Sequence, residues 1–458
     1  MPYYQDKLDL LTSSKICTNN TIKFLPSGGE SYKIRWKLLE NAKQSIHIAT
    51  FSMMKDGTTE KLEKLLLDKL EQGVEVCIIL DEIVNRSTFA SPMLKRLAKA
   101  GAKIHAYNGL LEEWLPLSSK KPFKHLMRIL KLKMKRHYHE KYMIVDGVEV
   151  ILGGINWGDK YAYGGIKDFA WRDTDVYLKG SIVTDIQTQF LRDFTRYKAW
   201  DNRSSSQPNF YPDFVKEQSA LSDEQVQEKY PQHFSESPDT KGDVAVRYVA
   251  HKPYDDNELA LTHAFLSLIE NAQESIYWGC HGIRPPKIYA EYFARAVKRG
   301  VKVHLITNSV KSSRSLMVKG LMGWMYKECT KFYRRLLNDG VHIYEWQKEG
   351  AFHSKNFLVD EKVASIGSYN IASGSTYHHS ESNIFVYDDD FAQQVKQQFN
   401  DDFQYCKEVK LAEIESKLPE QNAYDRPLHE RDLMIRKDMI PEAIQKELDK
   451  GNYKRILT

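Results

Sequence analysis

One pattern of residues occurs twice in this chain, and it constrains the fold more than any other feature. The spacing is H-x-K-x4-D-x6-G-[GS]-x-N in both copies. A single H-x-K would be noise, but two copies that match at every spacing indicate an internal duplication. The first copy consists of His139, Lys141, Asp146, Gly153, Gly154 and Asn156, and the second of His353, Lys355, Asp360, Gly367, Ser368 and Asn370.

The repeat extends well beyond the two motifs. In each half, amphipathic stretches that stop at a glycine alternate with short β-branched runs, which is typical of helices with a glycine C-cap followed by buried parallel strands. This alternation predicts an α/β sandwich in each half. The glycines are Gly73, Gly101, Gly300 and Gly340, and the matching segments are 38–53 with 268–283, 71–82 with 298–309, and 94–107 with 333–346.

The repeat also predicts how the chain divides. A polar stretch rich in Ser and Pro, without hydrophobic periodicity, separates the two halves and is typical of a linker. The last part of the chain is charged and contains three prolines, so we expect it to run over the surface. We therefore predict an N-terminal domain at 1–205 with the motif at 139–156, a linker at 206–242, a C-terminal domain at 243–410 with the motif at 353–370, and a tail at 411–458.

Composition narrows the class of protein only broadly. The chain has 458 residues, a hydrophobic fraction of 42% and a net charge of +5, which suits a two-domain globular protein that acts on anionic partners. The N-terminus lacks a signal-peptide pattern, and no apolar stretch is long enough for a membrane span. We expect a soluble or peripheral membrane protein on the cytoplasmic side, although a specialised secretion signal would be invisible. The scattered cysteines indicate reduced thiols: Cys17, Cys77, Cys280, Cys329 and Cys406.

The residue types of the motif suit a phosphodiester substrate. Alternation along a strand places each histidine and its lysine on the same face. The lysines can bind the non-bridging oxygens, the asparagine amides can donate to the same oxygens, and the glycine turns let the backbone approach. One imidazole can attack phosphorus to form a phosphohistidine, while the other protonates the leaving alcohol and then deprotonates the incoming one. The predicted substrate-binding residues are Asn156, Asn370, Gly154 and Ser368, and the predicted catalytic ones include His139, Lys141, His353 and Lys355.

A third group should fix the tautomer of each histidine. Glu381 follows His353 in HHSESN, and Asp173 follows His139 in WRDTDVYLKG, with Asp175 as an alternative to Asp173. The motif acids Asp146 and Asp360 fall at strand ends beside turns, where we expect a structural role. A metal site is not expected, because each motif sets one histidine beside a lysine whose charge would repel a cation. No cofactor is expected.

These motifs resemble the double-motif type of the phospholipase D superfamily over roughly residues 25–405. WRDTDVYLKG after the first motif, and GSYN followed by a glutamate eleven residues after Asn370, are most similar to the bacterial cardiolipin synthase branch. The resemblance implies two tandem α/β sandwich domains related by a pseudo-twofold axis, an active site between them and no required metal. It also implies His139 as nucleophile and His353 as acid and base, although the motif symmetry allows the reverse. IASGS after Asn370 departs from the D-x-R-S-like stretch common in that branch.

Two segments near the motifs combine basic and apolar residues. Residues 119–137 hold lysines and arginines among Leu, Met and Phe, and residues 314–327 are richer in Met, Leu and Trp. Both can be read as interfacial helices on an anionic membrane surface. The alternatives are a solvated helix face for the first segment and a lid or core helix for the second.

Three functions are consistent with the motifs. The first is a phosphatidyltransferase of the cardiolipin synthase type, or a phospholipase D that uses water and releases phosphatidic acid. The second is a nuclease or another phosphodiesterase, which is disfavoured because the basic segments hold Leu and Met rather than stacking aromatics. The third is a lipid-binding protein without activity, against which the intact motifs argue. We therefore expect a phospholipid substrate and no nucleic-acid partner.

Overall fold

The computed structural model describes residues 8–89, 91–107, 135–199, 221–234, 242–253, 259–314, 326–418, 423–425 and 435. The two predicted interfacial segments fall almost wholly outside these residues, since only 135–137 of the first and residues 314, 326 and 327 of the second are described. No helix in the described ranges has the length and apolar character needed to cross a membrane.

The first half alternates strands and helices as the sequence predicts, and the motif then adds antiparallel strands. Its elements are β1 (Ile16–Leu25), α2 (Gly28–Asn41), β2 (Ser45–Thr50), α3 (Gly57–Glu71), β3 (Glu75–Asp81), α4 (Arg86–Phe89), α5 (Pro92–Lys99), β4 (Lys103–Tyr107), β5 (His137–Tyr138), β6 (Tyr142–Val145), β7 (Glu149–Gly153), α7 (Asp159–Ala162), β8 (Asp175–Gly180), α8 (Ile182–Arg196) and β9 (Lys198–Ala199).

The second half repeats this order. Its elements are β10 (Val244–His251), α10 (Ala260–Asn271), β11 (Ser275–Gly279), α11 (Lys287–Lys298), β12 (Lys302–Asn308), α12 (Val310–Arg314), α14 (Tyr333–Asn338), β13 (His342–Trp346), β14 (Phe357–Val359), β15 (Val363–Gly367), α15 (Ser373–Tyr377), β16 (His379–Tyr387), α16 (Asp389–Phe403), β17 (Cys406–Glu408), α17 (Leu411–Ile414) and the 3-10 turns η3 (Glu415–Lys417) and η4 (Ala423–Asp425).

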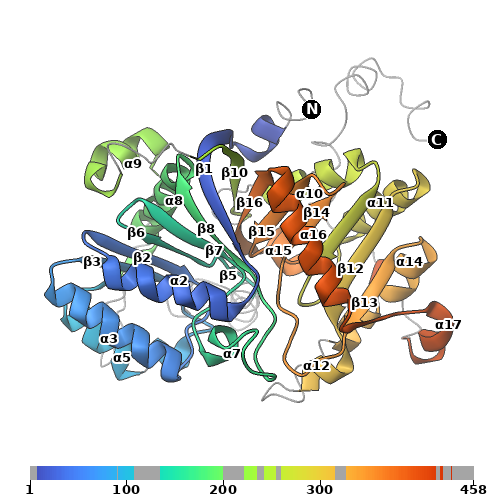
Figure 1. Ribbon diagram of the computed structural model, residues 1–458, viewed down its shortest axis with the longest axis horizontal. Helices are drawn as coiled ribbons and strands as arrows, with labels where there is room; N and C mark the ends of the chain where they lie inside the picture. The colour runs from blue at the N-terminus through green and yellow to red at the C-terminus, as the bar shows by residue number, and fades with distance from the viewer. Residues whose placement is uncertain are drawn as a thin grey trace, which may run out of the picture.

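The strands of both halves form one mixed sheet. Its order is β9-β4-β3-β2-β6-β7-β8-β1-β10-β16-β15-β14-β11-β12-β13-β17. The strands β2, β3 and β4 are parallel, as are β11, β12 and β13, whereas the motif strands are antiparallel. β1 and β10 pair at the centre, so the two predicted sandwiches share a sheet and are related by a pseudo-twofold axis (Figure 1).

Local sequence explains where the helices begin and end. Ser27, Asp56 and Asp388 cap the N-termini of α2, α3 and α16 by accepting a hydrogen bond from a first-turn backbone N–H. The glycines predicted to end helices all have positive φ, from 84° at Gly73 to 109° at Gly101, as a left-handed C-cap requires.

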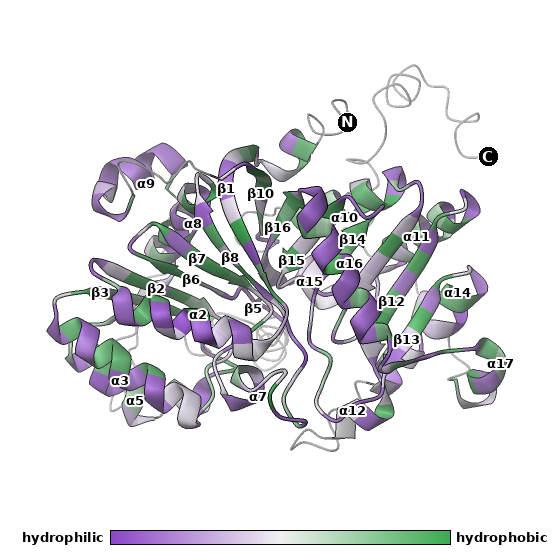
Figure 2. Ribbon diagram, viewed as in Figure 1, coloured by the Kyte–Doolittle hydropathy of each residue, from purple (hydrophilic) through white to green (hydrophobic). Residues whose placement is uncertain are grey.

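The cores lie on the two faces of the sheet. Alternate residues of β3 face opposite sides: Val76 and Ile78 pack with α2, α3 and α5, while Cys77 and Ile79 pack with α8. The cluster around α8 also includes α16 and strands of both halves, so one core spans the junction. Figure 2 shows hydrophobic residues concentrated on the strands and hydrophilic residues over the helices.

Part of the predicted linker and part of the tail have defined structure. Helix α9 (Asp223–Lys229) and the 3-10 turn η2 (Pro231–His233) follow the first half, with Val226 fully buried in the core that contains α8. In the tail, Tyr424 is buried and its hydroxyl donates to the carbonyl of Pro285. The described parts of both segments therefore pack on the domains.

Candidate active site

The two H-x-K motifs meet at the junction between the halves. Each histidine and lysine of the pair is buried, with 6% of His139 and 7% of His353 exposed. The backbone of each motif is held by the opposite half, because His139 N donates to Ser380 O at 2.9 Å and His353 N donates to Arg172 O at 2.7 Å. The pseudo-twofold axis therefore brings the predicted site residues together from distant parts of the chain.

Each histidine pairs with the acid of the other half. His139 Nδ1 lies 2.8 Å from Glu381 Oε2, and His353 Nδ1 lies 2.5 Å from Asp173 Oδ2. Each acid follows one histidine in sequence but contacts the other in space. Asp175, the alternative to Asp173, does not reach a histidine, because it forms a buried ion pair with Arg35 at 2.8 Å.

The two histidine–acid pairs differ in their electrostatics. Burial acts to raise the pKa of Glu381, but its interactions with His139, through charge when that imidazole is protonated and through the hydrogen bond, outweigh burial together with the hydrogen bond of His379 and lower the pKa below its usual range. Burial raises the pKa of Asp173 to about 7. Burial also lowers the pKa of His139 to about 3, and burial with the nearby Lys355 charge lowers that of His353 well below its usual value. Both imidazoles are therefore neutral near pH 7.

The second residue of each Gly-[GS] turn is another difference between the two pairs. The Ser368 hydroxyl donates to Glu381 Oε2 at 2.5 Å, and Ser375 donates to Oε1 at 2.5 Å. At the equivalent position Gly154 supplies no donor, and a Cβ there would overlap Asp173 Oδ1. Hydrogen-bond donors stabilise the charged form of a carboxylate. Ser368 and Gly154, which are predicted to bind substrate, thus also contact the two acids.

The two lysines lie beside the histidines of their own motifs. Both Lys141 and Lys355 donate from Nζ to the backbone carbonyl of the histidine two residues earlier. Burial lowers the pKa of Lys141 to about 7 and also lowers that of Lys355. A bound phosphodiester would favour the charged form of both groups, so binding of an anion is expected to take up a proton.

The two asparagines of the motifs differ in their surroundings. Asn156 is fully buried, its amide donates to the Tyr161 hydroxyl at 2.9 Å, and its carbonyl accepts from Ser52 N at 3.0 Å. These two hydrogen bonds fix the orientation of the Asn156 amide, and binding of phosphate by this residue stays a prediction. Asn370 is partly exposed, and its carbonyl accepts from the Cys280 thiol at 3.4 Å.

The motif acids Asp146 and Asp360 lie away from the histidines. Asp146 has a φ of 54° and accepts hydrogen bonds from the backbone N–H groups of Lys43, Gln44 and Ser45. Asp360 has a φ of 52° and accepts from three corresponding groups at 273–275. Each acid thus ties a β-turn to the start of β2 or β11.

Aromatic rings that sequence reasoning missed form the walls of the site. Phe51 packs edge-on against His139 with 4.6 Å between ring centroids, and His281 and Trp171 each lie 5.1 Å from His353. The ring of His379 lies 5.6 Å from the His139 ring, measured between centroids. The repeat alignment held a signal for them, since Phe51 and His281 occupy the same place in segments 38–53 and 268–283.

Comparison with known proteins places the chain in a family. The family described as "Cardiolipin synthase, PLD-like domain" matches residues 36–193 and 265–403. The chain belongs to this family. The two matched ranges contain the two H-x-K motifs, as the resemblance to the phospholipase D superfamily predicted.

Relatives in the same family support this assignment. The chain is 27% identical to cardiolipin synthase 1 of Staphylococcus epidermidis over 411 residues, which cover 90% of this chain and 71% of the relative. It is 27% identical to cardiolipin synthase 2 of Bacillus cereus over 404 residues, which cover 88% of this chain and 68% of that relative. The solved phosphatidylserine synthase of Haemophilus influenzae Rd KW20 has the same fold, with a TM-score of 0.62, 15% identity and coverage of 99% of this chain and 98% of that one.

The close contact at Gly154 makes a testable prediction for this family member. Gly154→Ala is expected to push Asp173 away from His353 and to lower kcat by about 10²-fold, because a displacement of about 1 Å in a catalytic contact has that effect. Ser368→Ala removes a donor to Glu381 without a steric clash and is the matched control. Steady-state kinetics of both variants, with circular dichroism to verify folding, measure the effect. Equal kcat in Gly154→Ala and the wild type would contradict it.

Proposed function

We propose that this protein is a phosphatidyltransferase of the cardiolipin synthase type, which acts on membrane phospholipids through a phosphohistidine intermediate. The observation that carries the proposal is the pair of neutral, buried histidines, each held by an acid of the opposite half, beside two buried lysines. Such a site can bind a phosphodiester and supply both a nucleophile and an acid.

In the first step, His139 Nε2 attacks phosphorus. Nδ1–H of His139 donates a hydrogen bond to Glu381, which leaves the lone pair of the imidazole on Nε2. The interaction with His139 favours the ionised form of Glu381, and this charge stabilises the imidazolium that develops as the N–P bond forms. Lys141 and Lys355 neutralise the non-bridging oxygens.

His353 serves as the acid and base. Its pair with Asp173 retains a proton up to near neutral pH, because the pKa of Asp173 is raised by burial to about 7. The pair can release this proton to the departing headgroup oxygen as the P–O bond breaks. In the second step His353 removes the proton of the incoming alcohol, which attacks phosphorus and releases His139.

The choice of acceptor separates transfer from hydrolysis. An alcohol acceptor such as the hydroxyl of glycerol or phosphatidylglycerol gives a new phospholipid, whereas water gives phosphatidic acid. Phe51, Trp171 and His281 surround the histidines with rings, which favours exclusion of water. The names of the relatives favour transfer to a lipid alcohol.

The proposed substrate implies contact with a membrane. The basic and apolar residues in segments 119–137 and 314–327 support binding to an anionic membrane surface, and we assign the protein to the cytoplasmic side as a peripheral protein. No nucleic-acid partner is part of this proposal.

Lipid mass spectrometry tests the function directly. The purified chain is incubated with liposomes of phosphatidylglycerol and phosphatidylethanolamine plus glycerol, beside the double variant His139→Ala/His353→Ala. We expect cardiolipin or headgroup-exchanged lipid from the wild type and none from the double variant. Phosphatidic acid as the only product would show a hydrolase, and the absence of any lipid product would refute action on phospholipids.

A further inference from the structure

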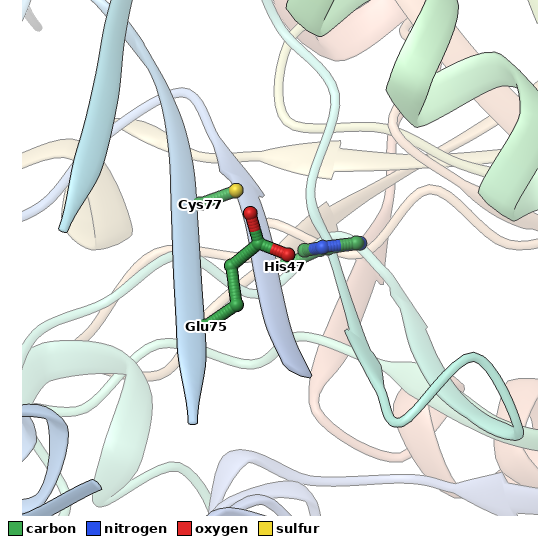
Figure 3. Close-up of side chains that lie close together, drawn as sticks. All are labelled: His47, Glu75 and Cys77. Carbon is green, nitrogen blue, oxygen red and sulfur yellow. The ribbon is translucent and has the colours of Figure 1, made fainter. Parts of the chain in front are cut away.

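A second cluster of potential ligand groups lies beneath α8, away from the two H-x-K motifs. His47 of β2 and Cys77 of β3 are direct neighbours across the parallel strand pair, and Glu75 precedes Cys77 on the same face. One ligand atom from each of the three residues lies within 4.8 Å of the others (Figure 3). Imidazole, thiolate and carboxylate form a donor set that suits zinc.

One ring nitrogen of His47 is buried and makes no hydrogen bond to the described residues. Its side chain is fully buried and stacks on Phe190 with 4.7 Å between ring centroids. Nδ1 bonds to the Gln187 carboxamide, 3.2 Å from its oxygen and 3.0 Å from its nitrogen, but Nε2 has no hydrogen-bond partner among the described residues. A buried polar atom without a partner is costly, and a contact to the other ring nitrogen is the usual way to orient a metal-binding histidine.

A fourth donor comes from the segment between the two halves. His233, in the turn η2, is buried, and its Nε2 lies 3.2 Å from Glu75 Oε2. Its ring centroid is 4.9 Å from that of His47. The three clustered residues come from two strands of the first half, and His233, which contacts Glu75, comes from the connection to the second. A structural zinc site needs four such donors.

The pseudo-twofold axis provides an internal comparison. The positions that correspond to His47, Glu75 and Cys77 are occupied by Tyr277, Lys302 and His304, as the strand registers show. There Tyr277 stacks on His304 with 4.9 Å between ring centroids. The fold is thus built without a ligand cluster at this place in the second half, so the cluster in the first half is not a packing requirement.

We propose that His47, Glu75, Cys77 and His233 bind one Zn²⁺, which fastens the connection at 231–233 to the sheet of the first half. Cys77 loses its thiol proton to solvent on binding, so one thiolate and one carboxylate balance the charge of the ion. Lys103, which now pairs with Glu75, has a side chain that is 60% exposed and can turn into solvent. The site is structural and takes no part in the transfer reaction.

Metal analysis of the full-length chain tests the proposal. After chelation and dialysis against Zn²⁺, we expect about one zinc per chain in the wild type, and a loss of most of it in His47→Asn and Cys77→Ser. His304→Asn is the matched control, because it removes the corresponding histidine of the second half, and it should retain zinc. Addition of Zn²⁺ to the metal-free chain should raise Tm for the wild type and for this control only.

Cobalt substitution identifies the ligands even if a variant folds poorly. Co²⁺ added to the metal-free wild type should give a thiolate-to-metal charge-transfer band, which the cluster of His139, His379 and Glu381 at the active site cannot produce because it lacks a thiol. Zinc that persists in both His47→Asn and Cys77→Ser would overturn the proposal. So would a wild-type chain that binds no zinc, or one whose cobalt complex lacks the thiolate band.

Discussion

Replacing His139 with alanine is expected to lower turnover of a natural phospholipid by roughly 10⁴-fold or more, because the covalent intermediate can no longer form. Replacing His353 is expected to lower it by a similar factor for a different reason, since the headgroup alcohol then departs without a proton. Headgroup release from short-chain phospholipid measures both losses.

A substrate with an activated leaving group separates the two roles. A phosphatidyl ester of 4-nitrophenol needs no acid to release its alcohol, so His353→Ala should recover a burst of nitrophenolate and accumulate phosphohistidine, while His139→Ala should show neither. Mass spectrometry of the intact chain detects the covalent lipid adduct. If His139→Ala recovers the nitrophenolate burst instead, the roles of the two histidines are reversed. The proposed activity on phospholipids would still stand.

The assignment also predicts which acid matters to which step. Glu381 holds His139, so Glu381→Gln should slow formation of the adduct on the activated substrate, whereas Asp173→Asn should act mainly on natural substrates. This contrast follows from the crossed pairing.

The duplication made much of the fold predictable from sequence. Repeated helices ending at Gly73 and Gly300, each followed by a β-branched run, indicated parallel strands that the structure contains. It was not predictable that the two sandwiches share a sheet. The two half-sheets join through β1 and β10, and neither of these strands carries a motif. The antiparallel orientation of the motif strands was also not predicted, because the hydrophobic pattern of a buried strand does not show its orientation.

The site was predictable in its components but less so in its contacts. The motif identified both histidines, yet sequence distance could not show that each acid crosses the axis. Ser368 is predicted to bind substrate because the Gly-Ser turn lets the backbone approach, and the hydrogen bond of its hydroxyl to Glu381 could not be seen from the motif. Asn156 is predicted to bind phosphate, and the hydrogen bonds of its buried amide with Tyr161 and Ser52 could not be seen from the spacing of the motif.

The second large effect is expected on stability, and it comes from a buried ion cluster at the junction between the halves. Lys252 of the second half contacts Glu140 and Asp193 of the first, and it donates to the Ser380 hydroxyl at 2.8 Å. All four side chains are buried. Lys252→Ala leaves two carboxylates without their cation, which is expected to lower the free energy of unfolding by about 3–5 kcal/mol. Urea unfolding followed by circular dichroism measures the change.

Two further variants show whether the stability loss in Lys252→Ala comes from unpaired charge or from lost packing. Lys407→Ala, which breaks an exposed pair with Glu413, should leave stability nearly unchanged. Adding Glu140→Gln and Asp193→Asn to Lys252→Ala should restore much of the loss, because the charges that lack a partner are then removed. If the triple variant is no more stable than Lys252→Ala, the loss comes from packing instead.

The same cluster predicts a pH dependence and a link to activity. Burial raises the pKa of Glu140 from 4.5 to about 7, so the folded chain binds more protons there than the unfolded chain, and stability falls as pH rises through this window. Without Lys252 the pKa of Glu140 should rise further, so the free energy of unfolding of Lys252→Ala should fall with pH over a window that extends above 7. Because the carbonyl of Ser380 holds His139, a junction loosened in this way should also reduce kcat, and more strongly at high pH than at low pH. A variant that loses stability equally at all pH values would show that Glu140 is not the group that Lys252 stabilises.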